Sequence, residues 1–370
     1  MAKTNFAALD DHAKMVWSRT VWKQAREKMF TSKFSGTSQN SMIHRITELT
    51  KSERGTEAVV PLVPDLVEDG VTGDNTLEGS EEAMKSVQDK IQIDQLRHAV
   101  ANTGRVADQK TVVNFRVNAK DQLSYWLADR CDQMSFLTLA GMQYTVNNDG
   151  SARGGNLSSL SFASDVSGPT SERYLQVSGN DVVDGDNSSL AATDFLGYRH
   201  IVQLQAKAKT RYLRGIRGNG GSETYHLFLH PMAMSRLKLD EDFKLNARHA
   251  QGRGDSNTLW AGGESYVVDG IHIHEFRHVP TTMGLTATNK WGSSGNVEGC
   301  RALLCGAQAL AMIDLDAGYW DEEDYDYKNR YGISYGKMFG LKKPTFKFAK
   351  NTANSSVKQD YGVIAVDIAI

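Results

Sequence analysis

Hydrophobic and polar positions follow different periods in successive parts of this chain, and the period predicts an element for each part. Residues 10–29 carry apolar side chains at helical spacing, among them Met15, Trp22 and Met29. The pattern predicts a helix there, within a polar N-terminal arm over residues 1–41. We expect an arm of this kind to tie down on a neighbouring molecule.

In residues 42–100 the hydrophobic pattern changes to the two-residue period of an extended chain. Residues 58–64 contain two prolines, which lack the backbone donor of a ladder and suit an edge strand. Further on, Val87, Ile91 and Ile93 alternate with polar residues, as in a half-buried strand. The two strands predict a long hairpin. Because an isolated two-stranded hairpin is marginally stable in water, we expect it to lie across another copy of the chain.

Between the two strands lies a glycine-rich, acidic tip, and we predict that it forms an intersubunit contact. The residues assigned to this contact are Gly70, Val71, Gly73, Asp74, Leu77, Glu78, Gly79, Glu81 and Glu82.

The longest helical pattern runs from residue 106 to Gly141 and predicts a rigid spine. Asn118 is a candidate cap for its second half, and Gly141 is a candidate for its end. From residue 119 onward the helix would span about 35 Å at 1.5 Å per residue. Its predicted core stripe consists of Leu123, Trp126, Leu127, Met134 and Leu137.

After Tyr144 the composition becomes rich in Ser, Gly and Asp, which predicts loops, short strands and the start of a second domain. Helices and strands then alternate, as in an α+β module. The expected elements are a helix over 194–212, a strand over 225–229, a helix over 231–248, strands within 266–276, an apolar run over 302–313 and a terminal strand over 362–368. We expect the terminal strand to return to the spine helix.

Composition narrows the class of protein. The chain has 370 residues, of which 40% are hydrophobic and 23% charged, so it can bury a large core. Its three cysteines form no disulfide framework or zinc pattern, and we expect buried free thiols in a reducing compartment. Apolar runs fall short of the roughly 20 residues of a membrane span, and we predict neither export nor membrane insertion.

The net charge of −2 supplies no overall basic field for tight binding to nucleic acid. A local basic cluster can be interpreted either as a phosphate contact or as a solvated helix face. It consists of Lys207, Lys209, Arg211, Arg214 and Arg217.

The candidate for catalytic chemistry is a pair of histidines. His272 and His274 lie two apart in an expected strand, so they share a face and could share a metal ion. A full site needs a third ligand, which the sequence does not identify. We therefore predict no cofactor and no enzyme activity, and we keep a metal-dependent enzyme built on these two histidines as an alternative.

Two sets of residues carry a resemblance to a known family. The first comprises Leu49-Thr50-Lys51, Leu66, Gly70-Val71, Gly73-Asp74, Leu77-Glu78-Gly79, Glu81-Glu82, Ile93-Asp94 and Arg97. The second comprises Phe339-Gly340-Leu341-Lys342-Lys343-Pro344-Thr345-Phe346 and Asp360-Tyr361-Gly362-Val363-Ile364. In these residues the chain resembles the major capsid proteins of N4-like tailed bacteriophages, whereas residues 145–300 match only in general character.

The resemblance implies a Hong Kong 97-type capsid fold of the α+β class. The implied parts are an N-terminal arm (1–41), an extended hairpin loop (42–100), a peripheral domain with the spine helix (101–146), an axial domain (147–300) and a return to the peripheral domain (301–370). In this fold the glycines would let the tip conform to a neighbouring subunit, and Glu78, Glu81 and Glu82 would pair with basic groups there.

The implied function is that of a major capsid protein, a structural component of the virion. Copies would assemble in the host cytoplasm into hexamers and pentamers of an icosahedral phage head around double-stranded DNA, with weak, non-specific DNA contact. A separate scaffolding protein and a portal are expected partners, and decoration proteins are left open. The alternative within the same fold is an encapsulin-like shell that stores protein cargo.

Overall fold

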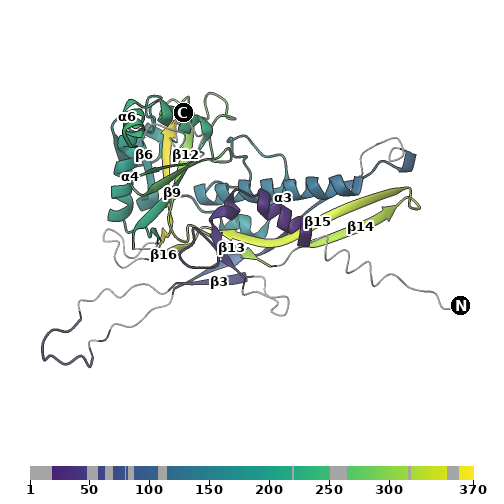
Figure 1. Ribbon diagram of the computed structural model, residues 1–370, viewed down its shortest axis with the longest axis horizontal. Coiled ribbons are helices and arrows are strands. Elements are labelled where there is room, and N and C mark those ends of the chain that lie inside the picture. The colour runs from purple at the N-terminus through teal and green to yellow at the C-terminus, as the bar shows by residue number, and fades with distance from the viewer. Residues whose placement is uncertain are drawn as a thin grey trace.

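The computed structural model contains two large β-sheets, a long helix that contacts both of them, and a hairpin that projects from the body (Figure 1). The mixed α+β prediction is confirmed. The structure describes residues 19–47, 57–62, 70–79, 81, 87–106, 115–218, 221–250, 265–315, 318–347 and 358–370.

The six-stranded sheet is built around β15 (Arg330–Lys342). On one side of β15 lies β5 (Asp94–Ala101), and on the other side β13 (Leu310–Asp314) and β14 (Tyr319–Tyr325) follow one another. Ile333, Tyr335, Phe339 and Leu341 of β15 are apolar and buried, and Lys337 in the same alternating set is buried as well, which is the period of a strand with one covered face. The sheet is completed by β2 (Ile43–Ile46), parallel to β13, and by β1 (Ser35–Gly36), parallel to β2.

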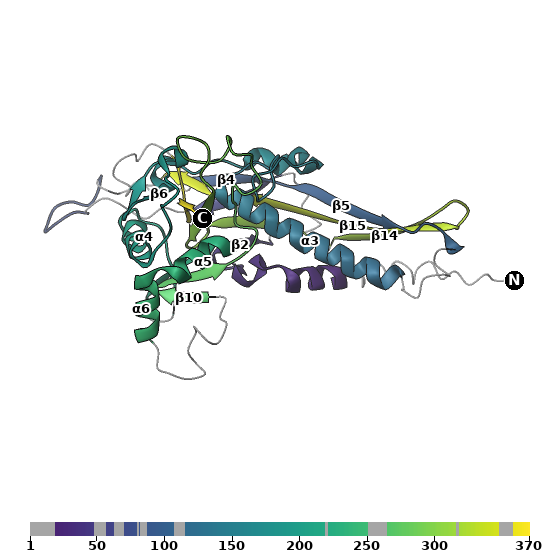
Figure 2. The same ribbon diagram turned by 90° about the horizontal axis from the view of Figure 1, so that it is seen from above.

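Helix α3 (Phe115–Ala140) packs against β15 and β5 and reaches β12 of the other sheet (Figure 2). Gly141 ends it as expected: its φ is +69°, and the N–H of Met142 donates to the carbonyl of Leu137 at 2.9 Å. The suggestion that Asn118 caps a second half is wrong, because the helix is continuous through that position. Residues 134–140 are buried on every face, not along one stripe, because both sheets contact this end of the helix.

The eight-stranded sheet has the order β10-β11-β9-β12-β18-β6-β7, with β8 paired to β9. Its strands are β6 (Tyr174–Ser178), β7 (Asp181–Asp184), β8 (Ile216–Arg217), β9 (Glu223–Leu229), β10 (Ser265–Val268), β11 (Ile271–Glu275), β12 (Gly299–Cys305) and β18 (Val363–Ala369). The expected return of the terminal strand to the spine helix is not what the structure shows. Instead, β18 is buried along its whole length between β12 and β6.

The apolar run over 302–313 forms two strands in different sheets. The chain leaves the eight-stranded sheet at the end of β12 and enters the six-stranded sheet at β13. Gly306 lies in the crossing, where a Cβ would be 2.1 Å from the carbonyl oxygen of Arg214. Residues 301–370 are therefore shared between the two sheets.

Helices α4 (Tyr198–Thr210), α5 (Pro231–Leu239) and α6 (Glu241–Ala250) accompany the eight-stranded sheet (Figure 1). The single helix predicted over 231–248 is wrong, because Asp240 has an extended backbone and divides it. The Asp240 carboxylate accepts the N–H of Phe243 at 3.2 Å and that of Tyr198 at 3.0 Å. One side chain thus caps both α6 and α4.

The described part of the N-terminal arm lies on its own chain. A helix over residues 19–28 buries Val21, Trp22 and Ala25 in the main core. Residues 19–41 are thus anchored on their own subunit, and contact of the arm with a neighbour stays a prediction. Residues 1–18 lie outside the described residues.

Candidate functional site: the hairpin and its surroundings

The hairpin predicted from the sequence is formed by β3 (Glu57–Leu62) and β4 (Val87–Gln92), which pair antiparallel from Glu57–Gln92 to Leu62–Val87. Within the described chain, these two strands form a sheet of their own. The other strands in the range 42–100, β2 and β5, belong to the six-stranded sheet.

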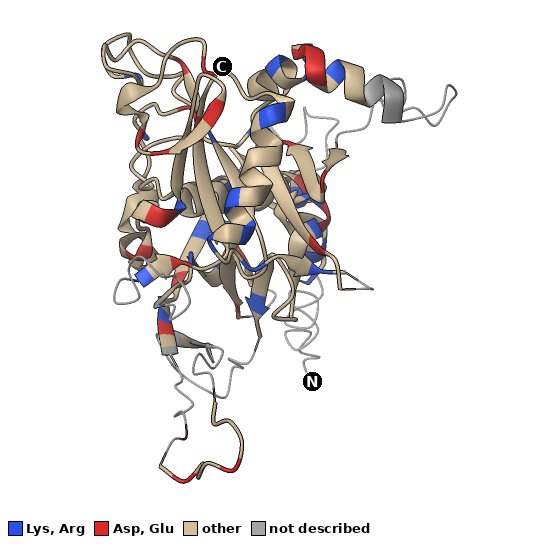
Figure 3. Ribbon diagram, turned by 90° about the vertical axis from the view of Figure 1, so that its left-hand side faces the viewer, with Lys and Arg blue, Asp and Glu red and all other residues tan. Residues whose placement is uncertain are grey.

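The tip of the hairpin stands clear of the body, and its acidic residues lie at the far end (Figure 3). Gly70, Gly73 and Gly79 have positive φ, and a Cβ added at any of them would meet no atom within 4 Å. Leu77 is 59% exposed, and the Glu81 carboxylate accepts the N–H of Gly79 at 2.8 Å. The tip is therefore held by local turns. Of the residues assigned to the contact, Glu82 lies outside the described residues.

The base of the hairpin is anchored. Ile91 is fully buried in a small cluster that includes Ile46, Ile313 and Phe346. The Asp89 carboxylate pairs with the ammonium group of Lys342 at 2.8 Å and accepts the N–H of Thr345 at 3.2 Å. Lys342 also donates to the carbonyl of Lys90 at 2.6 Å. The angle at which the hairpin leaves the body is set by these contacts.

The spine residues named from the sequence lie against the six-stranded sheet. Leu123, Leu127, Met134 and Leu137 are buried, whereas Trp126 is half-buried and stacks on His98 of β5 with ring centroids 4.6 Å apart. The helix and the sheet therefore form one packed unit.

The end of the N-terminal helix is fastened to α3 by Asp132. This buried carboxylate accepts the N–H of Phe30 at 2.9 Å and both the N–H and the hydroxyl of Thr31, at 3.1 and 2.6 Å. Burial raises the pKa of Asp132, and the hydrogen bonds from Thr31 and Phe30 oppose this rise.

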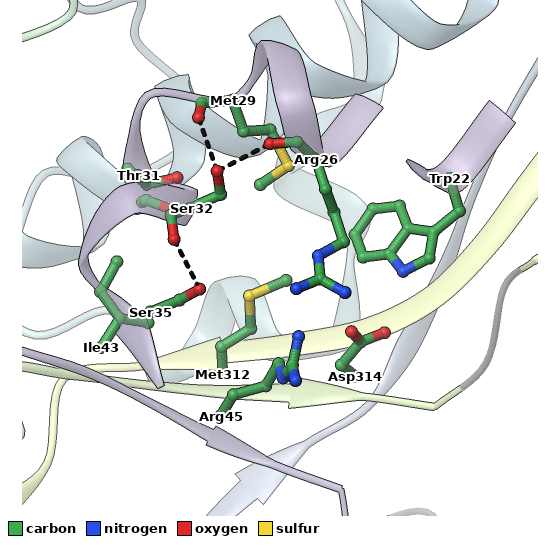
Figure 4. Close-up of a pocket in the computed structure, with 11 residues that line it drawn as sticks. Trp22, Arg26, Met29, Thr31, Ser32, Ser35, Ile43, Arg45, Met312 and Asp314 are labelled. Atoms are coloured by element: carbon green, nitrogen blue, oxygen red, sulfur yellow. Dashed lines mark hydrogen bonds between the residues drawn. The ribbon is translucent and has the colours of Figure 1, made fainter. Parts of the chain in front are cut away.

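Next to this junction, Trp22 and Arg26 of the helix face Arg45 and Asp314 of the sheet across a small cavity (Figure 4). The cavity measures about 20 Å³, room for about one water molecule. Buried Lys337 pairs with Asp314 at 2.5 Å and lies 3.7 Å from the centroid of the Trp22 ring. The junction is therefore a packing contact, too small to hold a ligand.

The histidines of β11 have a neighbour that the sequence analysis missed. The Nε2 atom of His274 lies 2.9 Å from Nδ1 of His226 on β9, so one ring donates a hydrogen bond to the other. The parallel register of β9 and β11, which places His226 beside His272, could not be read from either segment alone. Burial, followed by the charge of neighbouring histidines, lowers the pKa of both His226 and His274 to about 4.

Within the part of the chain that the structure describes, no group of three or more His, Cys, Asp or Glu side chains is placed to hold a metal ion. The metal-dependent alternative at His272 and His274 thus gains no support. Both residues are half-buried, and the ring centroid of Phe34 lies 5.0 Å from that of His274.

Four residues of the basic cluster have partners within the chain. Lys207 and Arg211 both pair with Asp184. Arg214 donates to the hydroxyl of Tyr361 at 2.9 Å, and Arg217 lies 3.6 Å from the carboxylate of Glu223. The cluster is therefore not a free basic surface, and the interpretation as a phosphate contact weakens.

Comparison with known proteins relates this architecture to a family. The sequence profile described as phage capsid protein matches residues 5–370. The chain belongs to this phage capsid protein family. It is 47% identical over 370 residues to the major capsid protein of Pseudomonas phage KPP25, covering 99% of this chain and 97% of that protein. The family is one of structural shell proteins and not a class of enzymes.

Solved phage capsids share the fold. The capsid of Ralstonia phage GP4 superimposes with a TM-score of 0.73 at 24% identity, over 92% of this chain and 90% of that one. The capsid of cyanophage Pam1 gives a TM-score of 0.71 at 17% identity, over 92% of this chain and 91% of that one. Both sheets and the spine helix are therefore those of a phage capsid fold. None of the helices described for this family member is long and apolar enough to cross a lipid bilayer.

Proposed function

We propose that this chain is the major capsid protein of a tailed phage and that its copies assemble into hexamers and pentamers of an icosahedral head around double-stranded DNA. The observation that carries the proposal is the match over nearly the whole chain to phage capsid proteins, including a major capsid protein at 47% identity. The exposed, projecting hairpin tip supports it, because such a tip has a use only where another subunit meets it.

We further propose that the fold is of the Hong Kong 97 type and that the chain is N4-like. In this interpretation the six-stranded sheet with α3 is the peripheral domain, the eight-stranded sheet is the axial domain, and β3–β4 is the extended loop. The glycine-rich acidic motif at Gly70–Glu82 supports the N4-like assignment. Each subunit would bury surface on its neighbours that it cannot bury alone, and closed symmetry would multiply these contacts.

Assembly would take place in the host cytoplasm, with a separate scaffolding protein and a portal as partners. Contact with the packaged DNA would be weak and non-specific, which agrees with the net charge of −2 and with the paired state of the basic cluster.

The proposal is tested by expressing the chain alone and together with the neighbouring genes of its source, followed by electron microscopy of the large fraction. Icosahedral shells, or rings of five or six subunits, are the expected result. A monomer or dimer under both conditions would overturn it. Shells that enclose a protein cargo and no DNA would favour the encapsulin-like alternative.

A further inference from the structure

One face of the six-stranded sheet carries several small residues on β15. The residues of β15 that alternate with its buried apolar side chains include Gly332, Ser334, Gly336 and Gly340. At Gly340 this face is covered by the chain's own β4, and a Cβ there would lie 2.3 Å from the carbonyl oxygen of Gln92. One end of the face therefore already receives a crossing segment of backbone, which only glycine admits.

Beyond Gly340 the same face is open and forms a shallow groove of about 230 Å³ between β5, β14 and β15. Gly336 of β15 is the register partner of both Tyr319 on β14 and Arg97 on β5, so the three residues form one row across the strands. Gly336 has no side chain, and the space above it is taken by the Arg97 stem, whose Cγ lies 2.7 Å from where a Cβ would be, and by the Gln95 amide, whose Nε2 lies 3.2 Å from that point. Arg97 is exposed, and no ion pair among the described residues engages it.

The hairpin tip carries an apolar and an acidic side chain that complement this groove. Leu77 is an exposed apolar side chain, and Glu78 beside it is exposed and, within the described residues, forms no ion pair. The groove lies where β14 begins beside the middle of β15, and Figure 1 shows the hairpin tip at the far left of the molecule and β14 right of its centre, so the tip cannot reach the groove of its own chain. The occupant must come from another copy.

We propose that Leu77 and Glu78 of one copy occupy this groove on a second copy. The leucine side chain lies in the groove beside Met338 and Tyr319, and the Glu78 carboxylate pairs with the Arg97 guanidinium. This inference rests on the proposed shell-forming function and specifies where the tip binds.

A second charged group faces the groove and determines where the carboxylate can sit. Asp321 lies two residues after Tyr319 on β14 and also lines the groove. Its negative charge repels Glu78 and confines it to the Arg97 side, which gives the contact one register. A single exposed ion pair is weak, but a shell repeats it in every subunit.

A charge swap tests the pairing. Glu78→Arg and Arg97→Glu should each lower the yield of shells at low salt by about tenfold, because each lost pair is weak but is repeated in every subunit. The double variant should restore the yield, because the pair is rebuilt with its charges exchanged. Asp321→Asn should not lower the yield. Single variants that assemble like the natural chain, or a double variant no better than either single one, would overturn the inference.

The apolar half of the contact has a matched control in the same chain. Leu77→Ser should lower the yield of shells, whereas Leu239→Ser, on α5 and exposed at 62% compared with 59% for Leu77, should not. Equal effects of the two variants would contradict a specific role for Leu77.

A second measurement does not depend on yield. In shells of the Glu78→Cys, Arg97→Cys double variant, oxidation should link neighbouring copies into a ladder on a non-reducing gel. The native cysteines are buried and do not compete. Shells whose subunits stay monomeric on that gel would overturn the docking site while leaving the proposed function intact. Failure of the natural chain to form shells at all would instead overturn the proposed function.

Discussion

At its base the β3–β4 hairpin is held by buried Ile91 and by the contacts of Asp89 with Lys342 and Thr345, whereas its tip projects into open space at Gly70, Gly73 and Gly79. The two ends of one element are thus stabilised by different means. The base draws its stability from its own chain, and the tip has only local turns. Changes at the two ends should therefore separate the stability of the subunit from the assembly of the shell.

The largest effect on subunit stability is expected from the spine helix α3, which packs on the six-stranded sheet. Leu127→Ala removes a fully buried side chain and should lower the free energy of unfolding by about 3 kcal/mol. Chemical denaturation of the unassembled subunit would measure the loss. Leu77→Ala at the tip is the control and should change the same quantity by less than about 0.5 kcal/mol. Similar losses of unfolding free energy in both variants would contradict the view that the spine stabilises the subunit and the tip does not.

At the hairpin base a smaller, local effect is expected. Asp89→Ala leaves the ammonium group of Lys342 and the N–H of Thr345 without this acceptor, at a cost of about 1–3 kcal/mol. Amide hydrogen exchange in β4 should become faster. Asp74→Ala at the tip should leave that exchange rate unchanged, and an unchanged rate in the Asp89 variant would show that Ile91 alone anchors the base.

Acid should weaken the body of the subunit through His226 and His274. Their pKa values in the folded chain are lowered to about 4, while unfolded histidines titrate near pH 6.5. Between these values the unfolded chain binds more protons, so this contribution to stability falls as the pH drops from about 6.5 to 4 and is constant below that. The double variant His226→Gln, His274→Gln should lose less in melting temperature than the natural chain between pH 7 and 4.5. Equal losses would contradict the assignment.

The smallest effect on the subunit itself is expected from charge reversal at the tip. Glu81→Lys with Glu82→Lys should leave solubility and melting temperature of the unassembled subunit unchanged, because Glu81 is exposed and bonded only to its own turn. Particle formation, counted by electron microscopy, should be impaired. Normal particle numbers would count against an electrostatic role for the tip.

Local patterns predicted the local elements of this molecule. The helical spacing up to Gly141 and the alternation at Val87–Ile93 correspond to α3 and β4, because period and capping act within one segment. The patterns failed where partners are distant in sequence. The place of β18 between β12 and β6, the crossing at Gly306 and the meeting of His226 with His274 all depend on how strands associate across the sheet.

Two further features of the fold depend on contacts that a periodic pattern does not show. Asp240 divides the expected helix because its carboxylate caps α6 and α4 at once. The arm packs on its own subunit because Asp132 of α3 binds the backbone at Phe30 and Thr31. The role of the tip residues in a contact stays a prediction from glycine and acidic residues at a spacing that suits no core. The groove that we propose to receive them could not be predicted, because it depends on three strands brought together only by folding.

The central position of β18 has a consequence for the order of events during translation. The eight-stranded sheet cannot close until residues 363–369 have left the ribosome, although β6 and β9 were synthesised long before. The six-stranded sheet has all its strands by residue 342. In a nascent chain the spine helix and the six-stranded sheet can therefore fold before the eight-stranded sheet. The subunit is complete only when nearly the whole chain has been made.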